Sequence, residues 1–455
     1  MSIYEPDKVL ELMNVKPKEK EKKENGEVFT PLYLVNEMLD QLDHAYTEEH
    51  GKSIFTEPHL KWFDPAAGIG NFPFVVYQRL MNGLNIPDRR KHILEQMIYA
   101  AELNPKNVLM YKTIFDGDKY KLHIYEGDTL KMDVKKESGV DKFDVILGNP
   151  PFNKGGIRSC TGKQLGEKNE TIWPKFIEKS FECLKPDGFL VFINPLSWLK
   201  KSHSLHNEML EKHIVWLKLW DNIKSLATIN GEIPISLFIL QNTKNATNKT
   251  TEIVSENKRK KLTTISNEYL NPKYSIPLAY HSIFDKLIQF IETHNCNLEY
   301  KTKTIKSSGT KEKIPTEYSL EDNWAIDTFT IKEGILVKKV IEQHPDANKR
   351  KLIIANKIGF KGAFIDEGKL NLTGNNKFYI LGDKLEVILK LMNFGFANII
   401  CDYTKYCMSF LDNGAFTYIP DIRKLGIQDI TEDEFYKLIG FTPQEINDFW
   451  RQDKN

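Results

Sequence analysis

The sequence predicts an α/β fold, in which a Rossmann-like parallel sheet is followed by a separate mixed α+β C-terminal domain. Short apolar runs alternate with helical patterns over the first half of the chain. Such alternation favours a parallel sheet with right-handed crossovers. The first run ends in a turn that contains two glycines, and a polar stretch at residues 242–264 separates this half from a region of shorter strand-like runs.

Length and composition indicate a globular protein with more than one domain. The chain has 455 residues, of which 41% are hydrophobic and 27% are charged. At roughly 150 residues per domain this length gives two or three domains. No apolar run reaches the ~18 residues of a membrane-spanning helix, and the N-terminus lacks the apolar core of a signal peptide. We therefore expect a cytoplasmic protein without a membrane segment.

Charge and cysteine content exclude little by themselves. Lys and Arg number 63 against 62 Asp and Glu, so the formal net charge of +1 neither favours nor excludes nucleic acid as a partner. Any basic surface must be local. None of the 5 cysteines forms a C-x-x-C pair and no H-E-x-x-H occurs, so we expect no bound metal.

Shifts in composition divide the chain into four parts. Residues 1–25 form an N-terminal arm that includes a charged run, and residues 26–241 form the α/β domain. Residues 242–264 are polar, contain the basic run NKRKK and are expected to be a linker or an exposed strand edge. Residues 265–455 form the second domain, which ends in a helical stretch broken near a glycine and a proline.

The α/β domain is expected to open with a helix. Thr30 is its predicted N-cap and Pro31 occupies its first position, after which apolar residues recur at helical spacing from Leu32 to Leu42. A further helix is expected at 173–186. The strand-like runs are 60–64, 97–102, 122–128, 143–149, 188–195, 213–220 and 234–241, and the last two leave no room for a long helix between them.

Acidic residues and glycines stand where three of these strands end. Asp64 is followed by Gly68-x-Gly70, a turn that lets a ligand approach the backbone. Glu102 and Asp128 end the next two strands, and a carboxylate at such a position can accept both hydroxyls of a ribose. Each feature alone would be a plain strand-to-helix turn or a solvated acid. Their common position at one edge of the sheet is what indicates a ligand-binding site.

The fourth strand ends in Asn149-Pro150-Pro151-Phe152. The prolines have no amide hydrogen, which leaves backbone carbonyls as free acceptors. Asn149 adds an amide oxygen beside them. A group of acceptors binds an NH2 group, and Phe152 offers a flat apolar face for a ring. A structural turn could also use Asn-Pro-Pro, but it would not need the aromatic residue.

These motifs resemble those of the S-adenosylmethionine-dependent amino-methyltransferases. The cofactor motif precedes the catalytic motif and a large C-terminal region follows, which is similar to the gamma class of DNA adenine-N6 methyltransferases. The resemblance covers about residues 26–241 and extends only loosely to 265–455. The Asn-Pro-Pro-Phe motif does not by itself separate adenine in DNA from glutamine in protein or guanine in RNA. The matching positions, in order, are Phe29-Thr30-Pro31, Asp64-Pro65-x-x-Gly68-x-Gly70, Glu102, Asp128 and Asn149-Pro150-Pro151-Phe152.

The resemblance implies a class I methyltransferase sheet, S-adenosylmethionine as cofactor and a C-terminal target-recognition domain. Phe29 and Thr30 would contact the methionine end of the cofactor, whereas Asp64 and the glycine turn would border its methionine and ribose. Glu102 would hold the ribose hydroxyls and Asp128 the adenine amino group. The implied catalytic residues are Asn149, Pro150, Pro151 and Phe152. The implied cofactor-binding residues are Phe29, Thr30, Asp64, Ala66, Gly68, Gly70, Glu102, Asp128 and Phe176, the last packing near the cofactor's adenine.

The expected activity is methyl transfer to N6 of an adenine that is flipped out of duplex DNA. Double-stranded DNA is the expected partner, a cognate restriction endonuclease is a further candidate, and we expect a monomer or weak dimer. Three alternatives stay open: an RNA or protein-glutamine N-methyltransferase with the same motif, a DNA-specificity subunit with an inactive methyltransferase domain, and a fused restriction nuclease.

Three features are left over. Residues 225–237 lack the second aromatic residue that members of the family often place opposite the motif's aromatic, so aliphatic side chains near Ile229 or Ile233 are expected there. The loop 153–170 is basic and leaves the catalytic motif directly, as a DNA-clamping loop or a plain surface loop would. Pro345-Asp346 with Glu367-x-Lys369 mimics a nuclease metal site, a pattern that often arises by chance.

Overall fold

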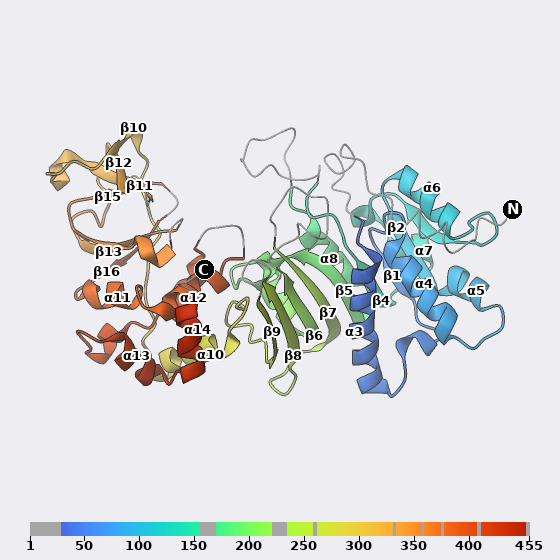
Figure 1. The fold of residues 1–455 in the computed structure, drawn as a ribbon. Coiled ribbons are helices and arrows are strands. Elements are labelled where there is room, and N and C mark those ends of the chain that lie inside the picture. The colour runs from blue at the N-terminus through green and yellow to red at the C-terminus, as the bar shows by residue number, and fades with distance from the viewer. Residues whose placement is uncertain are drawn as a thin grey trace. The chain divides into compact units, whose positions relative to one another are not determined.

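The computed structural model divides into two compact units, Met1–Trp198 with Ser202–Lys273, and Leu199–Lys201 with Tyr274–Asn455. Each unit is considered by itself, and Figure 1 follows the chain through both. In the part that the structure describes, no helix is both long and apolar enough to cross a bilayer. The described residues are 29–154, 170–220, 234–257, 262–330, 334–356, 359–374, 377–406 and 411–451.

A nine-stranded sheet forms the centre of the first unit, in the order β3-β2-β1-β4-β5-β7-β6-β8-β9. The first five strands of this order pair in parallel, and β7 runs antiparallel to both of its neighbours. The predicted strands are therefore confirmed. The connection between the last two of them, residues 221–233, lies outside the described residues. The bounds are β1 Trp62–Asp64, β2 Ile98–Glu102, β3 His123–Glu126, β4 Phe143–Gly148, β5 Leu184–Pro195, β6 Lys212–Trp220, β7 Ile235–Lys244, β8 Thr251–Asn257 and β9 Leu262–Glu268.

The order of the strands reverses between β1 and β4. Strand β1 pairs with β2 on one side, where Asp64 lies opposite Ala100, and with β4 on the other, where Phe63 lies opposite Ile146. The chain moves outward from β1 to β2 and β3, and then returns to place β4 and β5 on the other side. In open α/β sheets such a reversal leaves a crevice at the carboxyl ends of the strands, where ligands bind.

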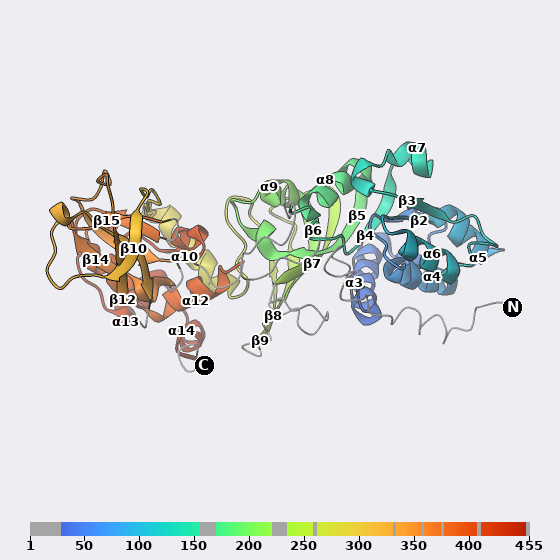
Figure 2. The ribbon, with the colours of Figure 1, turned by 90° about the horizontal axis from the view of Figure 1, so that it is seen from above.

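Helices cover both faces of this sheet. Figure 2 shows α3, α4 and α6 on one side of the strands and α7, α8 and α9 on the other. Apolar side chains of α3, α4 and α6 share one buried cluster with alternate residues of the central strands. The helix bounds are α3 Leu32–His50, α4 Asn71–Gly83, α5 Arg89–His92, α6 Pro105–Ile114, α7 Val134–Ser138, α8 Trp173–Cys183 and α9 Leu205–Leu210, with single turns at η1 Ile54–Thr56, η2 Ile93–Met97, η3 Thr129–Lys131 and η4 Leu196–Leu199.

The start of α3 differs from the prediction. Thr30 is not its N-cap, because the helix begins at Leu32 and the carbonyl of Pro31 accepts from the backbone N–H groups of Leu34 and Val35. The Thr30 side chain is buried and is used elsewhere in the fold.

Residues 242–264 were predicted to be a linker or an exposed strand edge. The structure places strands in this range, at one end of the sheet, so the first alternative, a linker, is wrong. Strand β8 pairs in parallel with β6, and β9 pairs antiparallel with β8. Alternate residues of β8 are buried, among them Thr251, Ile253 and Ser255. Two of these three are polar, so the segment lacks the apolar run by which an inner strand is recognised. The compact unit continues to Lys273.

The second unit is a mixed α+β domain, as predicted. It holds a four-stranded sheet in the order β10-β12-β11-β15 and a three-stranded sheet in the order β14-β13-β16. The strands are β10 Ser308–Lys313, β11 Trp324–Thr330, β12 Gly334–Lys339, β13 Arg350–Ala355, β14 Phe364–Glu367, β15 Asn371–Leu372 and β16 Lys377–Leu381. The helices are α10 His281–His294, α11 Leu385–Leu391, α12 Gly395–Tyr403, α13 Glu432–Ile439 and α14 Pro443–Arg451, with short 3-10 helices at η6 Leu320–Asp322, η7 Gly359–Gly362, η8 Asn413–Tyr418 and η9 Ile422–Leu425.

Candidate cofactor and substrate site

The turn after β1 is tight and lies under aromatic rings. The N–H of Gly70 donates to the carbonyl of Ala67 at 2.8 Å, and Gly70 has a φ of +99°. A Cβ on Gly70 would lie 2.9 Å from the Tyr111 ring, so this position requires glycine for its dihedral angle and for its space. The ring of Phe29 covers the turn at Gly68, 3.3 Å from where a Cβ would stand. The structure therefore brings Phe29 onto the predicted glycine turn.

Glu102 ties this turn to the end of β2. Its Oε2 accepts from the N–H of Gly68 at 2.8 Å, and its Oε1 accepts from the N–H of Asn104 at 2.7 Å. Only 9% of the residue is exposed. The carboxylate is thus held in one orientation at the carboxyl edge of the sheet, and the predicted acid and the predicted turn are in direct contact.

Asp64 is buried at the end of β1, and its Oδ1 accepts from the N–H of Ala66 at 3.0 Å. Burial raises the pKa of Asp64 to about 8; the nearby Glu102 carboxylate adds to the increase, and the Ala66 N–H partly offsets it. Near pH 7 this acid is therefore mostly neutral. A cation bound beside it would favour the carboxylate form.

The ends of β1 and β4 touch at Gly148. A Cβ on this residue would lie 2.7 Å from the Oδ1 atom of Asp64. Glycine is required here because the Asp64 carboxyl fills the space of a side chain. The contact places Asn149, the next residue, beside the buried acid.

Asn149 is oriented from the segment that precedes α3. Its Nδ2 donates to the Oγ1 of Thr30 at 3.2 Å. The carbonyl of Thr30 in turn accepts from the Nδ2 of Asn71 at 2.7 Å. Because its amide hydrogen points to Thr30, Asn149 presents its Oδ1 as an acceptor. Among the described residues, none donates to this oxygen or to the carbonyl of Pro150.

Two buried polar residues of the site were missed by the sequence analysis. Asn71 is the first residue of α4, and its Oδ1 is buried without a partner in the described part of the chain. Its only signal was its place directly after the glycine turn. Thr129 follows Asp128, and its Oγ1 donates to the carbonyl of Pro65 at 2.6 Å. This bond joins the end of β3 to the β1 turn, and no sequence pattern pointed to it.

Asp128 and Phe176 lie close to that junction. The Oδ1 of Asp128 accepts from the N–H of Leu130 at 3.1 Å and so caps η3. Phe176 is buried in α8, the helix that contacts η3. The predicted residues for the adenine end of a cofactor are therefore on neighbouring elements.

Phe152 is half-buried, and its side chain packs against the main apolar cluster of the first unit. The motif then pairs with the start of the next described segment, where Lys154 N–H donates to Glu170 at 2.8 Å and Ile172 N–H donates to Phe152 at 3.1 Å. The remaining predicted features of this region lie outside the described residues. They are the loop side chains Arg158, Lys163 and Lys168, and the aliphatic candidates Ile229 and Ile233.

The nuclease-like pattern of the second unit is not assembled as a metal site. The carboxylate of Asp346 accepts from Lys349, Lys301 and the Tyr379 hydroxyl at 2.7, 3.1 and 2.9 Å. Glu367 forms an ion pair with Arg350. No cluster of three or more metal-ligating side chains occurs within the described ranges.

The groups at the β1–β4 crevice fit S-adenosylmethionine. Its methionine end carries an ammonium group, which suits the buried Asp64 carboxyl and the unpaired acceptor of Asn71. Its ribose offers two hydroxyls near the strand end that carries Glu102. These matches concern residue chemistry and position, and the roles of the individual residues stay predictions.

The strand order with an antiparallel β7, together with a site at the β1–β4 reversal, defines a class I methyltransferase fold. S-adenosylmethionine is the cofactor of this class. Residues 69–226 match the model of the Eco57I restriction-modification methylase family. The predicted resemblance to adenine-specific methyltransferases is thereby confirmed for this part of the chain.

Individual relatives match over limited lengths. An "Uncharacterized adenine-specific methylase" of Mycoplasma pneumoniae is 25% identical, over 41% of this chain and 59% of the relative. A tRNA1(Val) (adenine(37)-N6)-methyltransferase of Porphyromonas gingivalis is 32% identical, over 18% of this chain and 32% of the relative. The chain thus spans less than two thirds of the length of these relatives.

Among solved structures, the type IIL restriction-modification enzyme MmeI in complex with DNA superposes with a TM-score of 0.51 and 12% identity. The match covers 91% of this chain and 71% of MmeI. The M protein of the type I restriction enzyme EcoKI gives a TM-score of 0.36 and 15% identity, over 50% of this chain and 47% of that one. At these identities the likeness to MmeI concerns the fold, and it confirms the predicted fold class.

Proposed function

We propose that the protein transfers a methyl group from S-adenosylmethionine to N6 of an adenine in duplex DNA. One observation carries the proposal. The Asn149 amide stands at the carboxyl edge of the sheet beside Asp64. One of its hydrogens is donated to Thr30, which leaves its oxygen to accept from a substrate. An amide oxygen and a proline carbonyl side by side suit an NH2 group that must be held by both hydrogens.

The residues act on the amine by accepting its hydrogens. When bound, S-adenosylmethionine supplies a strongly electrophilic methyl group. An exocyclic adenine amine is a poor nucleophile because its lone pair is delocalised into the ring. Hydrogen bonds to Asn149 Oδ1 and the Pro150 carbonyl favour a pyramidal nitrogen, whose lone pair is then localised and directed. Positioning and removal of water are the main tasks of such a site.

The target amine lies inside the duplex stack, so the base has to be flipped out to reach the crevice. Phe152 is the candidate ring on which the flipped base stacks. Its half-buried position suits this role, since one part of the ring packs on the core while another part can face a ligand. On the cofactor side, Asp64 would bind the ammonium group, Glu102 the ribose and Asp128 the adenine amine.

The second unit is the proposed target-recognition domain. A chain cut at the predicted domain boundary near residue 242 would lose β8 and β9 from the sheet, so it would not test this role cleanly. A chain that ends after Lys273 keeps the whole first unit. It should still bind S-adenosylmethionine and should lose its preference for the cognate duplex over a scrambled one in a competition assay.

The partners and the alternatives stay predictions. A cognate restriction endonuclease and a monomeric or weakly dimeric state belong to the proposed function. An RNA or protein-glutamine methyltransferase would use the same amine-binding motif, and a specificity subunit with an inactive domain would bind DNA without methyl transfer. The limited match to a tRNA methyltransferase keeps RNA among the substrates to be tested.

The proposal is tested by expressing the full chain in a host that lacks DNA methylation and mapping modified bases by single-molecule sequencing. We expect N6-methyladenine within one sequence motif. Asn149→Ala should abolish the modification, whereas Asn393→Ala, which changes an exposed asparagine of the second unit, should not. Calorimetry should show nearly unchanged cofactor affinity for Asn149→Ala. DNA would be rejected as the substrate by two results together: no modified adenine in the genome of the expressing host, and methylation of an RNA or protein substrate by the purified protein in vitro.

A further inference from the structure

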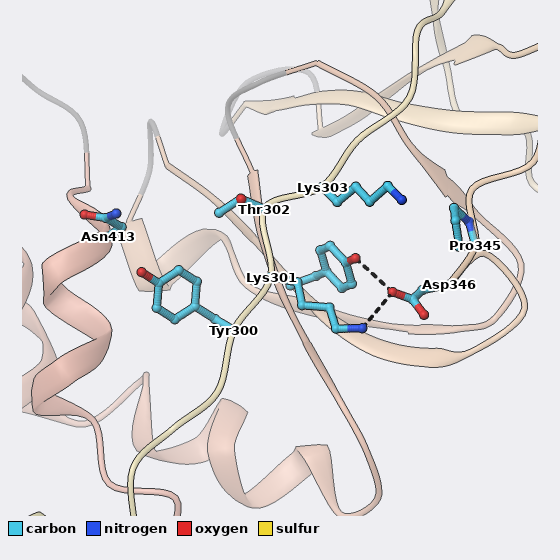
Figure 3. Close-up of a pocket in the computed structure, with 8 residues that line it drawn as sticks. Tyr300, Lys301, Thr302, Lys303, Pro345, Asp346 and Asn413 are labelled. Atoms are coloured by element: carbon cyan, nitrogen blue, oxygen red, sulfur yellow. Dashed lines mark hydrogen bonds and ion pairs between the residues drawn. The ribbon is translucent and has the colours of Figure 1, made fainter. Parts of the chain in front are cut away.

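An open groove lies within the second unit, which contains none of the methyltransferase motifs. Its volume is about 590 Å³. Figure 3 shows the segment of Tyr300, Lys301, Thr302 and Lys303 running along it, with Asp346 across from Lys301 and Asn413 next to Tyr300. Lys301, Thr302, Lys303 and Asn413 are exposed. The groove is therefore open to solvent along its side, as a site for a polymer is, rather than closed around a small molecule.

The carboxylate at the floor of the groove, that of Asp346, is neutralised by neighbouring lysines. Asp346 is buried, and burial alone would raise its pKa, but hydrogen bonds from Lys349, Lys301 and Tyr379 outweigh this effect and hold the pKa of Asp346 well below its usual range. The carboxylate therefore stays ionised and fixes Lys301 in place. One carboxylate faces two lysines here, so an excess of positive charge remains.

Lys303 adds a further positive charge on the same wall. Its ammonium group has no ion-pair or hydrogen-bond partner among the residues that the structure describes, and Figure 3 shows its side chain extending along the groove. The backbone behind it is fixed, since the carbonyl of Lys303 lies 3.0 Å from Nε2 of the buried His344. The wall thus holds an unpaired cation on a rigid support, which suits a phosphate group.

The other end of the groove is aromatic and polar. Tyr300 stacks on Phe416, with ring centroids 4.6 Å apart. The Asn413 side chain lies next to its hydroxyl end. Thr302 lies between this pair and the lysines. Hydroxyl and amide groups beside lysines are the usual donors to the sugar-phosphate backbone of nucleic acid.

We propose that this groove binds the sugar-phosphate backbone of a DNA strand, with a phosphodiester held by Lys303 and Lys301 and the neighbouring sugar beside Thr302 and Asn413. The inference rests on the proposed function, because it assigns a contact to the DNA that the first unit would methylate. What is new is the location of that contact, in this groove of the second unit. The groove would contribute to the affinity for DNA and not to the recognition of a particular base sequence.

The test measures the binding of a fluorescent duplex of random sequence to the full chain, by anisotropy, over a range of salt concentrations. Lys303→Ala should weaken binding several-fold at low salt and make the plot of log K against log salt shallower by roughly 0.9, the loss of one phosphate contact. Lys306→Ala is the matched control, since it removes an exposed lysine of the same segment that does not line the groove. It should leave the slope unchanged.

The outcomes separate this proposal from the proposed function. If the wild type binds and methylates DNA but Lys303→Ala matches Lys306→Ala in affinity and slope, the groove does not contact phosphate. If the wild type has no affinity for DNA, the proposed function fails as well. A duplex RNA of the same sequence serves as competitor. If it displaces the labelled DNA at a lower concentration than unlabelled DNA does, the assignment to DNA is overturned.

Discussion

Thr30 and Asn149 are 119 residues apart in the chain, yet the Asn149 Nδ2 donates to the Thr30 Oγ1 at 3.2 Å. This bond connects the segment before α3 to the end of β4. Because an amide has one donor end and one acceptor end, fixing the donor also fixes the direction of the acceptor. Thr30 is itself held by Asn71, so the orientation of the catalytic candidate depends on two residues outside its motif.

We first predict that Thr30→Val lowers kcat for DNA methylation. Valine keeps the shape of threonine and removes the hydroxyl, so the Asn149 amide loses its fixed orientation. A lost hydrogen bond of this kind costs ~1–3 kcal/mol, or roughly a fivefold to 150-fold loss of rate. Thr30→Ser keeps the hydroxyl and should retain most of kcat. Single-turnover rates at saturating cofactor measure the effect, and equal rates for the valine and serine variants would contradict it.

The pKa of Asp64 predicts that cofactor affinity depends on pH. Without ligand, the carboxyl is protonated below about pH 8. Binding a cation requires the carboxylate, so a proton must leave, and affinity should rise as the pH approaches 8 and level off above it. Asp64→Asn cannot titrate and should bind weakly at every pH.

The measurement is calorimetry with S-adenosylmethionine at several pH values. The amino group of the ligand also titrates, because an ordinary α-amine has a pKa of ~8. Dividing the wild-type affinity by the Asp64→Asn affinity at each pH removes this effect, since both proteins bind the same ligand. The pH dependence of that ratio then reports the titration of Asp64. A ratio that stays constant over the range would show that Asp64 is already ionised without ligand.

A third prediction concerns Gly70. Gly70→Ala forces a side chain into a positive φ and also brings its Cβ to 2.9 Å from Tyr111 and 3.0 Å from Phe115. Gly51→Ala has a positive φ of +71° as well, but nothing lies within 4 Å of its Cβ. Both should be destabilised by the dihedral angle, and Gly70→Ala by a further ~1–3 kcal/mol for the overlap. Urea unfolding of the two variants gives the difference, and equal midpoints would mean that the rings move aside without cost.

The last prediction concerns Phe152 and the flipped base. Stacking on an aromatic ring is worth ~1–3 kcal/mol per base. Phe152→Ala should therefore cut activity strongly, whereas Phe152→Tyr should largely preserve it. A 2-aminopurine at the target position should brighten on binding, and more so with the alanine variant, because the ring that quenches it is gone. The same brightness and turnover for wild type and Phe152→Ala would mean that this ring does not touch the base.

The sequence by itself determined which segments of the first unit form strands and which residues stand at the strand ends. Apolar runs and the residues that end them are local signals, and in a parallel sheet the ends of successive strands meet at one edge. Asp64, Glu102 and Asn149 could therefore be assigned to one crevice before any coordinates were known. The mixed α+β character of the second unit was also readable from its short runs.

Tertiary structure alone decided the polar contacts that make this crevice specific. The bonds from Asn149 to Thr30 and from Thr129 to Pro65 join segments that no spacing rule connects, because a hydrogen bond depends on position in space and not on separation in sequence. For the same reason the sequence did not separate a linker from an exposed strand edge at β8, since its polar residues are buried only once β6 lies beside it. The groove of Lys303 likewise exists only because Asp346 and Tyr379 fold against Lys301 and fix the wall from which Lys303 extends.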